Sequence, residues 1–193
     1  DEIETTVRKW ATGPAEDYLP YQPDEDGIPP MPLPGDGYRT HTTGLTHLET
    51  GFPTQVPEHV TRVISRLLDK VEMHRDKIEQ FEMTHCDDAD ILVVAFGITA
   101  RASERAVNIA RENGIKAGLL RPVTLWPFPE RKLKELAGRA SHVLVPEMNA
   151  GQLILEVERL CPDTTAVSGI NKFDGEPIPP DQVLAKIEEA ANE

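Results

Sequence analysis

The feature that most constrains the fold is a short, uninterrupted apolar run at residues 91–96, which ends at Gly97. Such a run predicts a strand buried on both faces, because a strand with one face in water alternates apolar and polar residues. A segment with helical periodicity follows at 103–112 and ends at Asn113-Gly114, a pair typical of a left-handed helix end. These residues therefore predict one strand and one helix of a parallel sheet.

The same alternation continues to the end of the chain. Further strands are expected at 115–120, 142–145 and 165–167, and further helices begin at residue 129 or 130, at 151 and at 181. Alternating strands and helices predict an open parallel sheet with flanking helices and right-handed crossovers. We therefore expect an α/β domain at 86–193.

The first 57 residues have a different composition. They hold 9 of the 17 prolines and 6 of the 13 glycines. Proline has no amide hydrogen and fits neither a helix interior nor a ladder, so an extended or turn-rich segment is expected. Its apolar residues, among them Trp10, Tyr18 and Tyr21, are too many for a solvated linker. We interpret residues 1–57 as an arm that lies on another protein surface.

A long helix is expected between the arm and the α/β domain. Apolar residues recur at steps of three and four from Val60 to Ile78, with basic residues between them. This periodicity predicts a helix over about 58–82, within a connecting segment at 58–85.

The composition excludes several classes of function. The net charge is −13, from 33 acidic and 20 basic residues, which argues against nucleic acid or an anionic membrane as a partner. No leader and no apolar run of roughly 20 residues is present, so a cytoplasmic protein is expected. The first residue is Asp1 rather than Met, and we expect the sequence to start inside a longer product.

No motif indicates a catalytic centre or a metal site in this chain. The two cysteines, Cys86 and Cys161, are far apart, and the histidines lack metal-ligand spacing. Gly35-Asp36-Gly37 matches the opening of the magnesium motif of thiamine-diphosphate enzymes, but the Asn expected roughly 25 to 30 residues later is missing, since the first Asn is Asn108. We interpret the triplet as a glycine-rich turn.

A stiff apolar loop is expected after the second strand. Residues 120–129 contain three prolines and two aromatic residues. A subunit interface, packing within the domain and a ligand contact all remain open, and exposed apolar loops favour the interface. Arg121 has the charge to pair with an anionic substrate, although an Arg at a strand end more often pairs with a structural carboxylate.

Two further loops follow strands at the edge where parallel sheets bind ligands. Gly97-Ile98-Thr99-Ala100 offers backbone amides to an anion, but it lacks the Gly-x-Gly-x-x-Gly pattern, and a simple tight turn is favoured. In the loop at 147–152, Asn149 and Gln152 have side chains that fix a loop or a ligand, and a capped helix start is favoured.

Several strings together carry a resemblance to a known family. They are Asp88-Ala89-Asp90-Ile91 through Gly97, Ala102 to Gly114, Arg121-Pro122-Val123-Thr124-Leu125-Trp126-Pro127-Phe128-Pro129, and Pro146-Glu147-Met148-Asn149-Ala150-Gly151-Gln152. The chain resembles the carboxyl-terminal half of the alpha subunit of 2-oxoacid:ferredoxin oxidoreductases. In that family this region is a second domain similar to the carboxyl-terminal domain of transketolase. Upstream, Thr43 to Gly51 resembles the segment that links the first and second domains, with Leu48 in place of the usual acid.

The resemblance implies an activity that belongs to a complex. Such enzymes oxidatively decarboxylate a 2-oxoacid on thiamine diphosphate with magnesium, reduce ferredoxin through iron–sulfur clusters and form acyl-CoA. The implied partners are a pyrimidine-binding domain, a beta subunit, a gamma domain, ferredoxin and coenzyme A, and this chain alone is expected to bind no cofactor. The Leu-Trp-Pro-Phe-Pro variant favours 2-oxoglutarate over pyruvate.

The resemblance also sets what this chain contributes. It implies a structural and interface domain, with no acid, base or nucleophile. The candidates for interface or substrate-channel contacts are Arg121, Thr124, Trp126, Asn149 and Gln152. Two alternatives remain: a stand-alone nucleotide- or anion-binding module that uses the Gly97 turn, and a non-catalytic assembly subunit.

Overall fold

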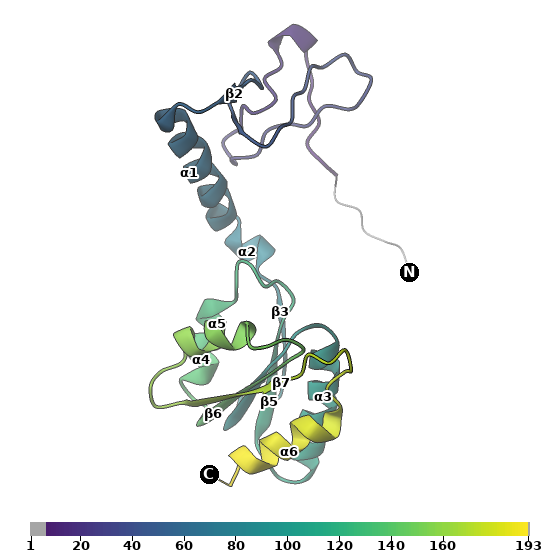
Figure 1. Ribbon diagram of the computed structural model, residues 1–193, viewed down its shortest axis with the longest axis vertical. Coiled ribbons are helices and arrows are strands. Elements are labelled where there is room, and N and C mark those ends of the chain that lie inside the picture. Colours follow the sequence, from purple (N-terminus) through teal and green to yellow (C-terminus); the bar gives the residue numbers. More distant parts are fainter. Residues whose placement is uncertain (1–6, 193) are drawn as a thin grey trace. The chain divides into compact units, whose positions relative to one another are not determined.

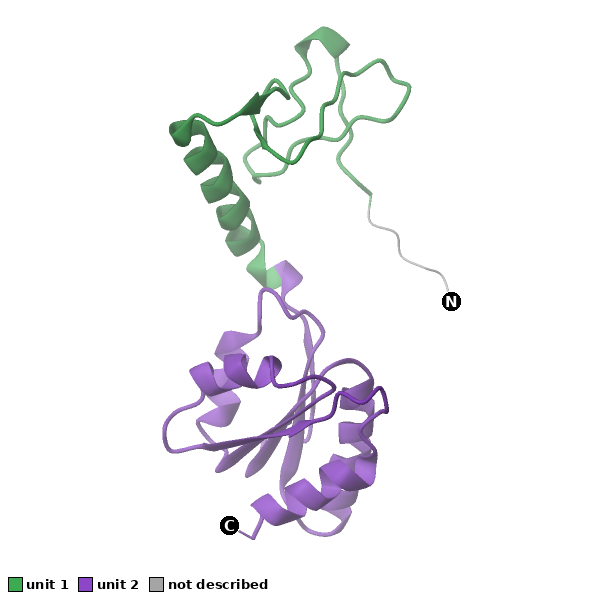
Figure 2. Ribbon diagram, in the orientation of Figure 1, with its two compact units in different colours: residues 1–76 green, residues 77–193 purple. Residues whose placement is uncertain are grey.

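The computed structural model describes residues 7–192. The chain forms two compact units, which divide between Asp76 and Lys77 (Figure 1, Figure 2). Within the described residues, no helix is both long enough and apolar enough to cross a membrane. The second unit contains the expected α/β domain, and the first contains the arm and the long helix.

The second unit is built on a five-stranded sheet in the order β3-β5-β4-β6-β7. Its strands are β3 (Phe81–Thr84), β4 (Ile91–Val94), β5 (Ala117–Pro122), β6 (His142–Glu147) and β7 (Ala166–Asn171). The last four pair in parallel, as their apolar runs predict. Sheet and helices together confirm the α/β fold class.

The edge of the sheet formed by β3 differs from the sequence prediction for residues 58–84. The helix expected over 58–82 is shorter: α1 spans Pro57–Met73, and the short α2 spans Arg75–Ile78. Residues 81–84 form β3 instead, which pairs antiparallel with β5, so the sheet is mixed rather than all parallel. Phe81 is half-buried and Met83 is exposed, so residues 81–84 show no clear apolar pattern. Their strand conformation is determined by backbone pairing with β5.

The helices cover both faces of the sheet (Figure 1). On one face lie α3 (Gly97–Glu112) and α6 (Pro180–Ala190), and on the other lie α4 (Glu130–Ala137) and α5 (Leu153–Leu160). The side chains of β4 alternate between the two layers: Leu92 and Val94 pack toward α4 and α5, and Val93 packs toward α3 and α6. All of them are fully buried, which explains the continuous apolar run.

The helix after β4 begins earlier than expected. The sequence predicts a turn at 97–100 and a helix from 103, whereas Gly97-Ile98-Thr99-Ala100 is the first turn of α3 itself. Gly97 has a φ of 58°, a left-handed conformation that lets the chain change direction directly from strand to helix. Glycine here therefore starts the helix rather than separating it from the strand.

The arm in the first unit is turn-rich rather than extended. It contains a short 3-10 helix, η1 (Ala15–Asp17), and a two-stranded antiparallel ribbon of β1 (Thr46–His47) and β2 (Pro53–Thr54). Tyrosine hydroxyls connect distant parts of the arm: Tyr18 donates to the Pro30 carbonyl at 3.0 Å, and Tyr38 donates to the Gly13 carbonyl at 2.9 Å.

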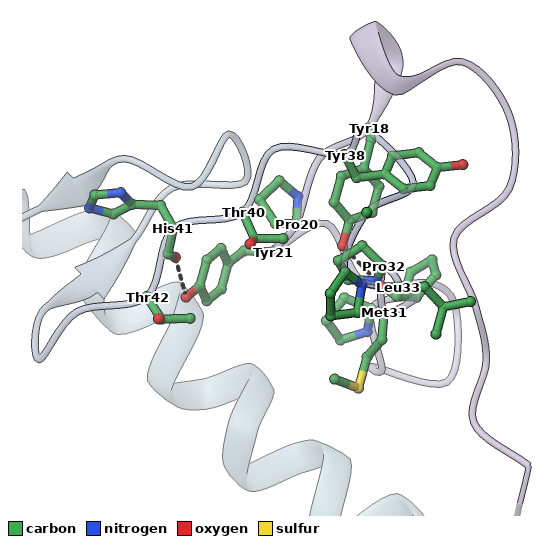
Figure 3. Close-up of a pocket in the computed structure, with 14 residues that line it drawn as sticks. Tyr18, Pro20, Tyr21, Met31, Pro32, Leu33, Tyr38, Thr40, His41 and Thr42 are labelled. Carbon is green, nitrogen blue, oxygen red and sulfur yellow. Dashed lines mark hydrogen bonds between the residues drawn. The ribbon is translucent and has the colours of Figure 1, made fainter.

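A cavity of about 430 Å³ lies within the arm, lined mainly by prolines and by three tyrosine rings (Figure 3). Tyr21, one of the lining residues, donates a hydrogen bond to the His41 carbonyl at 2.9 Å. Among the described residues of the first unit, only His47 has a buried side chain. Hydrogen bonds and turns, rather than an apolar core, therefore organise this unit.

Candidate functional site

The five candidate residues lie at the carboxyl ends of two strands or in the loops that follow them. Arg121 lies in β5, Thr124 and Trp126 lie in the β5–α4 loop, and Asn149 and Gln152 lie in the β6–α5 loop. The chain leaves β4 toward β5 and leaves β6 toward β7, so the connections diverge between β4 and β6. Ligand sites of open parallel sheets occur at such a point. The fold therefore brings the candidates to the edge where a site is expected.

Arg121 pairs with a carboxylate of its own chain. Its Nη1 lies 2.8 Å from Glu82 Oε2, and the two residues are direct partners in the β3–β5 pairing. Both side chains are more than a third exposed, so the ion pair contributes at most about 1 kcal/mol. Of the two roles weighed for Arg121, this structure shows the contact with a structural carboxylate.

Thr124 fixes the β5–α4 loop to the start of β3. Its Oγ1 accepts a hydrogen bond from the Gln80 amide at 2.9 Å, and the amides of Val123 and Thr124 donate to the Gln80 carbonyl at 2.9 and 3.1 Å. These three bonds hold the first half of the loop against β3. We call this arrangement the Gln80–Thr124 clasp.

The two aromatic residues of the loop have opposite environments. Phe128 is 6% exposed and packs in the core with Leu133 and Leu136 of α4, whereas Trp126 is 68% exposed. The peptide bond between Trp126 and Pro127 is cis. Packing within the domain thus accounts for Phe128 and leaves Trp126 on the surface.

Sequence reasoning missed the polar group that organises the β6–α5 loop. Glu147, the last residue of β6, is 1% exposed. Its carboxylate accepts hydrogen bonds from the amides of Gln152, Leu153 and Ile154, at distances from 2.8 to 3.1 Å. A buried carboxylate at a helix N-terminus is stabilised by the free amides and the helix dipole. Glu147 therefore caps α5 from the preceding strand.

Asn149 completes this helix start. Its Oδ1 accepts hydrogen bonds from the amides of Gly151 at 2.8 Å and Gln152 at 3.1 Å. Its carbonyl accepts a hydrogen bond from Asn171 Nδ2 at 3.4 Å, which links the loop to the end of β7. The Gln152 side chain is exposed, and it is the backbone amide of Gln152 that donates to Asn149. The geometry is that of a capped helix start, the interpretation that the sequence favours.

The described residues do not fit a metal or cluster site. Among residues 7–192, no three or more His, Cys, Asp or Glu side chains are grouped to hold a metal ion. Burial raises the pKa of the Cys86 and Cys161 thiols, which disfavours the thiolate needed for ligation or attack. Gly35-Asp36-Gly37 lies in an exposed turn in which both glycines have positive φ. Within residues 7–192, neither this turn nor the cysteine thiols form part of a grouped metal site.

The start of α3 lines a mainly apolar cavity that also carries a basic side chain. Ile98 is exposed, and it lines a cavity of about 380 Å³ together with Arg101, Pro177 and Ile178. The Ser103 hydroxyl, one turn further on, donates to the Thr99 carbonyl at 2.8 Å. The lining is mainly apolar, and Arg101 is the group besides the helix start that would suit an anion.

The geometry of the site does not identify a protein family, and comparison with known proteins does. Residues 89–183 match the family described as Pyruvate:ferredoxin oxidoreductase core domain II. The chain is also 40% identical over 188 residues to the 2-oxoglutarate synthase subunit KorA of Methanothermobacter thermautotrophicus, a match that covers 97% of this chain and 50% of the relative. The chain belongs to the 2-oxoacid:ferredoxin oxidoreductase family.

Two further proteins of this family are similar to the chain over nearly its whole length. The KorA subunit of Methanothermobacter marburgensis is 42% identical over 97% of this chain and 50% of its own length. A structure described as 2-oxoglutarate:ferredoxin oxidoreductase from Magnetococcus marinus with 2-oxoglutarate, coenzyme A and succinyl-CoA bound is similar with a TM-score of 0.81 and 25% identity, over 95% of this chain and 32% of that chain. The chain spans about half the length of the curated relatives that it matches. The resemblance predicted from the sequence is confirmed.

Proposed function

We propose that the chain is part of a 2-oxoacid:ferredoxin oxidoreductase, which oxidatively decarboxylates a 2-oxoacid to acyl-CoA and reduces ferredoxin. The observation that carries this proposal is the 40% identity to a 2-oxoglutarate synthase subunit over 97% of the chain. We favour 2-oxoglutarate over pyruvate as the substrate. The ligands bound in the structural relative, 2-oxoglutarate, coenzyme A and succinyl-CoA, support the same choice.

Within that enzyme, we assign this chain a structural and interface role. Two of its charged groups at the carboxyl edge already have partners inside the chain: Arg121 binds Glu82, and Glu147 binds backbone amides. Thiamine diphosphate with magnesium would supply the decarboxylation chemistry and iron–sulfur clusters the electron transfer, held by the pyrimidine-binding domain, the beta subunit and the gamma domain. Coenzyme A and ferredoxin would join the complex in the cytoplasm.

The five candidate residues have different parts in this proposal. Thr124 and Asn149 position the two loops, and Arg121 holds β3 to β5. Trp126 and the Gln152 side chain are exposed and are therefore the groups that would contact another domain or the substrate channel.

The test is to purify the tagged full chain with its partners from native extract. The recovered complex is assayed for reduction of a viologen dye with 2-oxoglutarate or pyruvate, with and without coenzyme A. We expect coenzyme-A-dependent activity that is faster with 2-oxoglutarate. Recovery of the chain alone, or of a complex that oxidises neither acid, would contradict the proposal. Tight binding of nucleotides by the isolated chain would instead favour a stand-alone binding module.

A further inference from the structure

The two edges of the sheet in the second unit differ in their exposed side chains. Every loop or helix start that follows a parallel strand exposes at least one large apolar side chain; these side chains are Ile98, Val123, Leu125, Trp126, Met148, Leu155 and Phe173. The segments at the opposite edge, 85–90, 113–116, 138–141 and 161–165, expose none. We call the first set the carboxyl-edge surface. Apolar side chains gathered on one edge of a domain indicate a surface that another protein covers.

The members of this surface come from neighbouring loops. The hydrogen bond from Asn171 to the Asn149 carbonyl joins the loops after β6 and β7. Ile98 and the segment 177–180 line the same cavity, so the start of α3 lies beside the loop before α6. The exposed apolar groups therefore belong to one side of the unit.

Trp126 has the properties of a dominant contact. Its loop is fixed on one side by the Gln80–Thr124 clasp and on the other by Phe128, which is buried in the core. A loop that is already ordered loses little conformational entropy when it binds. Tryptophan in such a setting is enriched among the residues that dominate interface energies. The 68% exposed Trp126 ring is thus presented in a fixed place.

Two basic side chains at this edge are already paired within the chain, which favours a permanent partner over a transient one. Arg121 is paired with Glu82 at 2.8 Å, and Lys172 is paired with Asp174 at 2.7 Å. Because these charges are compensated within the chain, they offer little electrostatic steering to a charged protein that binds and leaves. Interfaces that stay assembled are more apolar than transient ones.

The length of the relatives identifies the partner. In both Methanothermobacter KorA subunits the region matched by this chain is 50% of the polypeptide, so about as much chain again accompanies it. We propose that the carboxyl-edge surface docks the counterpart of the half of KorA outside this match, with Trp126 as the central contact. This inference rests on the proposed function, because it takes that counterpart to be present in the same complex.

Photo-crosslinking in the complex purified from native extract tests the partner. The variant Trp126→p-benzoylphenylalanine carries the crosslinker on the carboxyl-edge surface, and Asp163→p-benzoylphenylalanine carries it at an exposed position of the opposite edge. We expect crosslinks from position 126, and none from position 163, to peptides that align with the unmatched half of KorA. Crosslinks from position 126 to a second copy of this chain or to a separate electron carrier, or no crosslinks, would overturn the proposal.

Dissociation of the complex on dilution tests the energetic role of Trp126. We expect Trp126→Ala to weaken assembly about 30-fold or more, as for a dominant interface residue. Met83→Ala, at an exposed methionine of β3 outside the carboxyl-edge surface, is expected to change it less than about 3-fold. Thr124→Val, which removes the clasp hydroxyl, should weaken assembly, and Thr124→Ser, which keeps it, should not.

The two proposals fail in different ways. If the wild-type complex oxidises 2-oxoglutarate and Trp126→Ala assembles with unchanged affinity, the docking proposal is wrong and the proposed function stands. If the wild-type complex has no such activity, the proposed function fails whatever position 126 contacts. Equal thermal midpoints of the isolated wild-type and Trp126→Ala chains would show that the substitution leaves the fold intact.

Discussion

The two units of this chain obtain their structure by different means. In the α/β unit, β4 and β6 are buried along their whole length between two helical layers. In the first unit, α1 has no buried residue, and its apolar side chains Ile64, Leu67, Leu68 and Met73 are exposed. Hydrophobic burial is the main favourable term in folding, so only the α/β unit has the core of a self-sufficient domain.

The first unit is held together by hydrogen bonds, exposed ion pairs and ring contacts, each of which stabilises it only weakly. Besides the tyrosine bonds in the arm, Arg66 donates to the Gly27 carbonyl at 2.7 Å, and His74 Nε2 lies 3.0 Å from the Asp26 carbonyl. Each such bond contributes about 1 kcal/mol net, whereas ordering each residue costs about 1–2 kcal/mol in backbone entropy. We therefore expect the first unit to need the surface of another domain, as interpreted from its sequence.

The largest expected effect concerns a helical leucine in each unit. Leu133 of α4 is fully buried, whereas Leu68 of α1 is 59% exposed. We expect Leu133→Ala to lower the free energy of unfolding by about 3 kcal/mol, because it leaves a cavity in the core. The matched change Leu68→Ala should cost less than about 0.5 kcal/mol in the isolated chain. Urea denaturation of both variants measures this, and equal losses would contradict the contrast.

A smaller effect is expected at the buried carboxylate. Glu147→Gln removes the charge that accepts three backbone hydrogen bonds at the start of α5, and we expect a loss of about 2 kcal/mol in the free energy of unfolding. Glu158→Gln, an exposed change in the same helix, is the control and should be nearly neutral. The same denaturation experiment applies, and a neutral Glu147→Gln would show that the capping carboxylate is dispensable.

In the arm, Tyr38→Phe removes the hydroxyl that donates to the Gly13 carbonyl and keeps the aromatic ring. We expect a loss of about 1 kcal/mol, seen as roughly five-fold faster amide exchange in residues 10–40. Exchange in β6 should not change, because the α/β core does not depend on this bond. Slower folding or faster exchange throughout the chain would contradict the independence of the two units.

The smallest effect concerns the pH dependence of the α/β unit. A hydrogen bond from Arg111, whose Nη1 lies 2.8 Å from Asp88 Oδ1, lowers the pKa of that carboxyl. Because the folded pKa is depressed, the stabilisation is present above the unfolded value near about 4 and is lost as the pH falls through the folded value. Thermal midpoints should therefore be higher for wild type than for Asp88→Asn at neutral pH and should converge in acid. Asp163→Asn serves as the surface control, and a pH-independent difference for Asp88→Asn would be inconsistent with this ion pair.

Much of the α/β unit could be predicted from its sequence, because burial on both faces leaves continuous apolar runs. The strands β4, β5 and β6 follow from that signal, whereas β7, which is mostly half-buried or exposed, gives a weaker one. The edge strand β3 does not follow from it, since pairing with β5, rather than any local pattern in residues 81–84, makes it a strand. The helical periodicity upstream therefore extended the predicted helix too far.

The candidate site was predictable in place but not in detail. Topology puts the loops after β5 and β6 at one edge, and the sequence identifies both loops. It does not distinguish Trp126 from Phe128, because the position of α4 decides which ring is buried. It also missed Glu147, whose partners are amides five to seven residues later that come together only when α5 forms. An acid at the end of a buried strand and just before a helix is the signal that would have indicated it.

The difference in self-sufficiency between the two units is tested most directly by hydrogen exchange on the full chain, first alone and then in its purified complex. We expect the amides of β4, β5 and β6 to be protected in both states, and those of α1 to become strongly protected only in the complex. If the amides of α1 in the isolated chain were as protected as those of the α/β core, the first unit would be stable by itself, and its dependence on a partner would be contradicted.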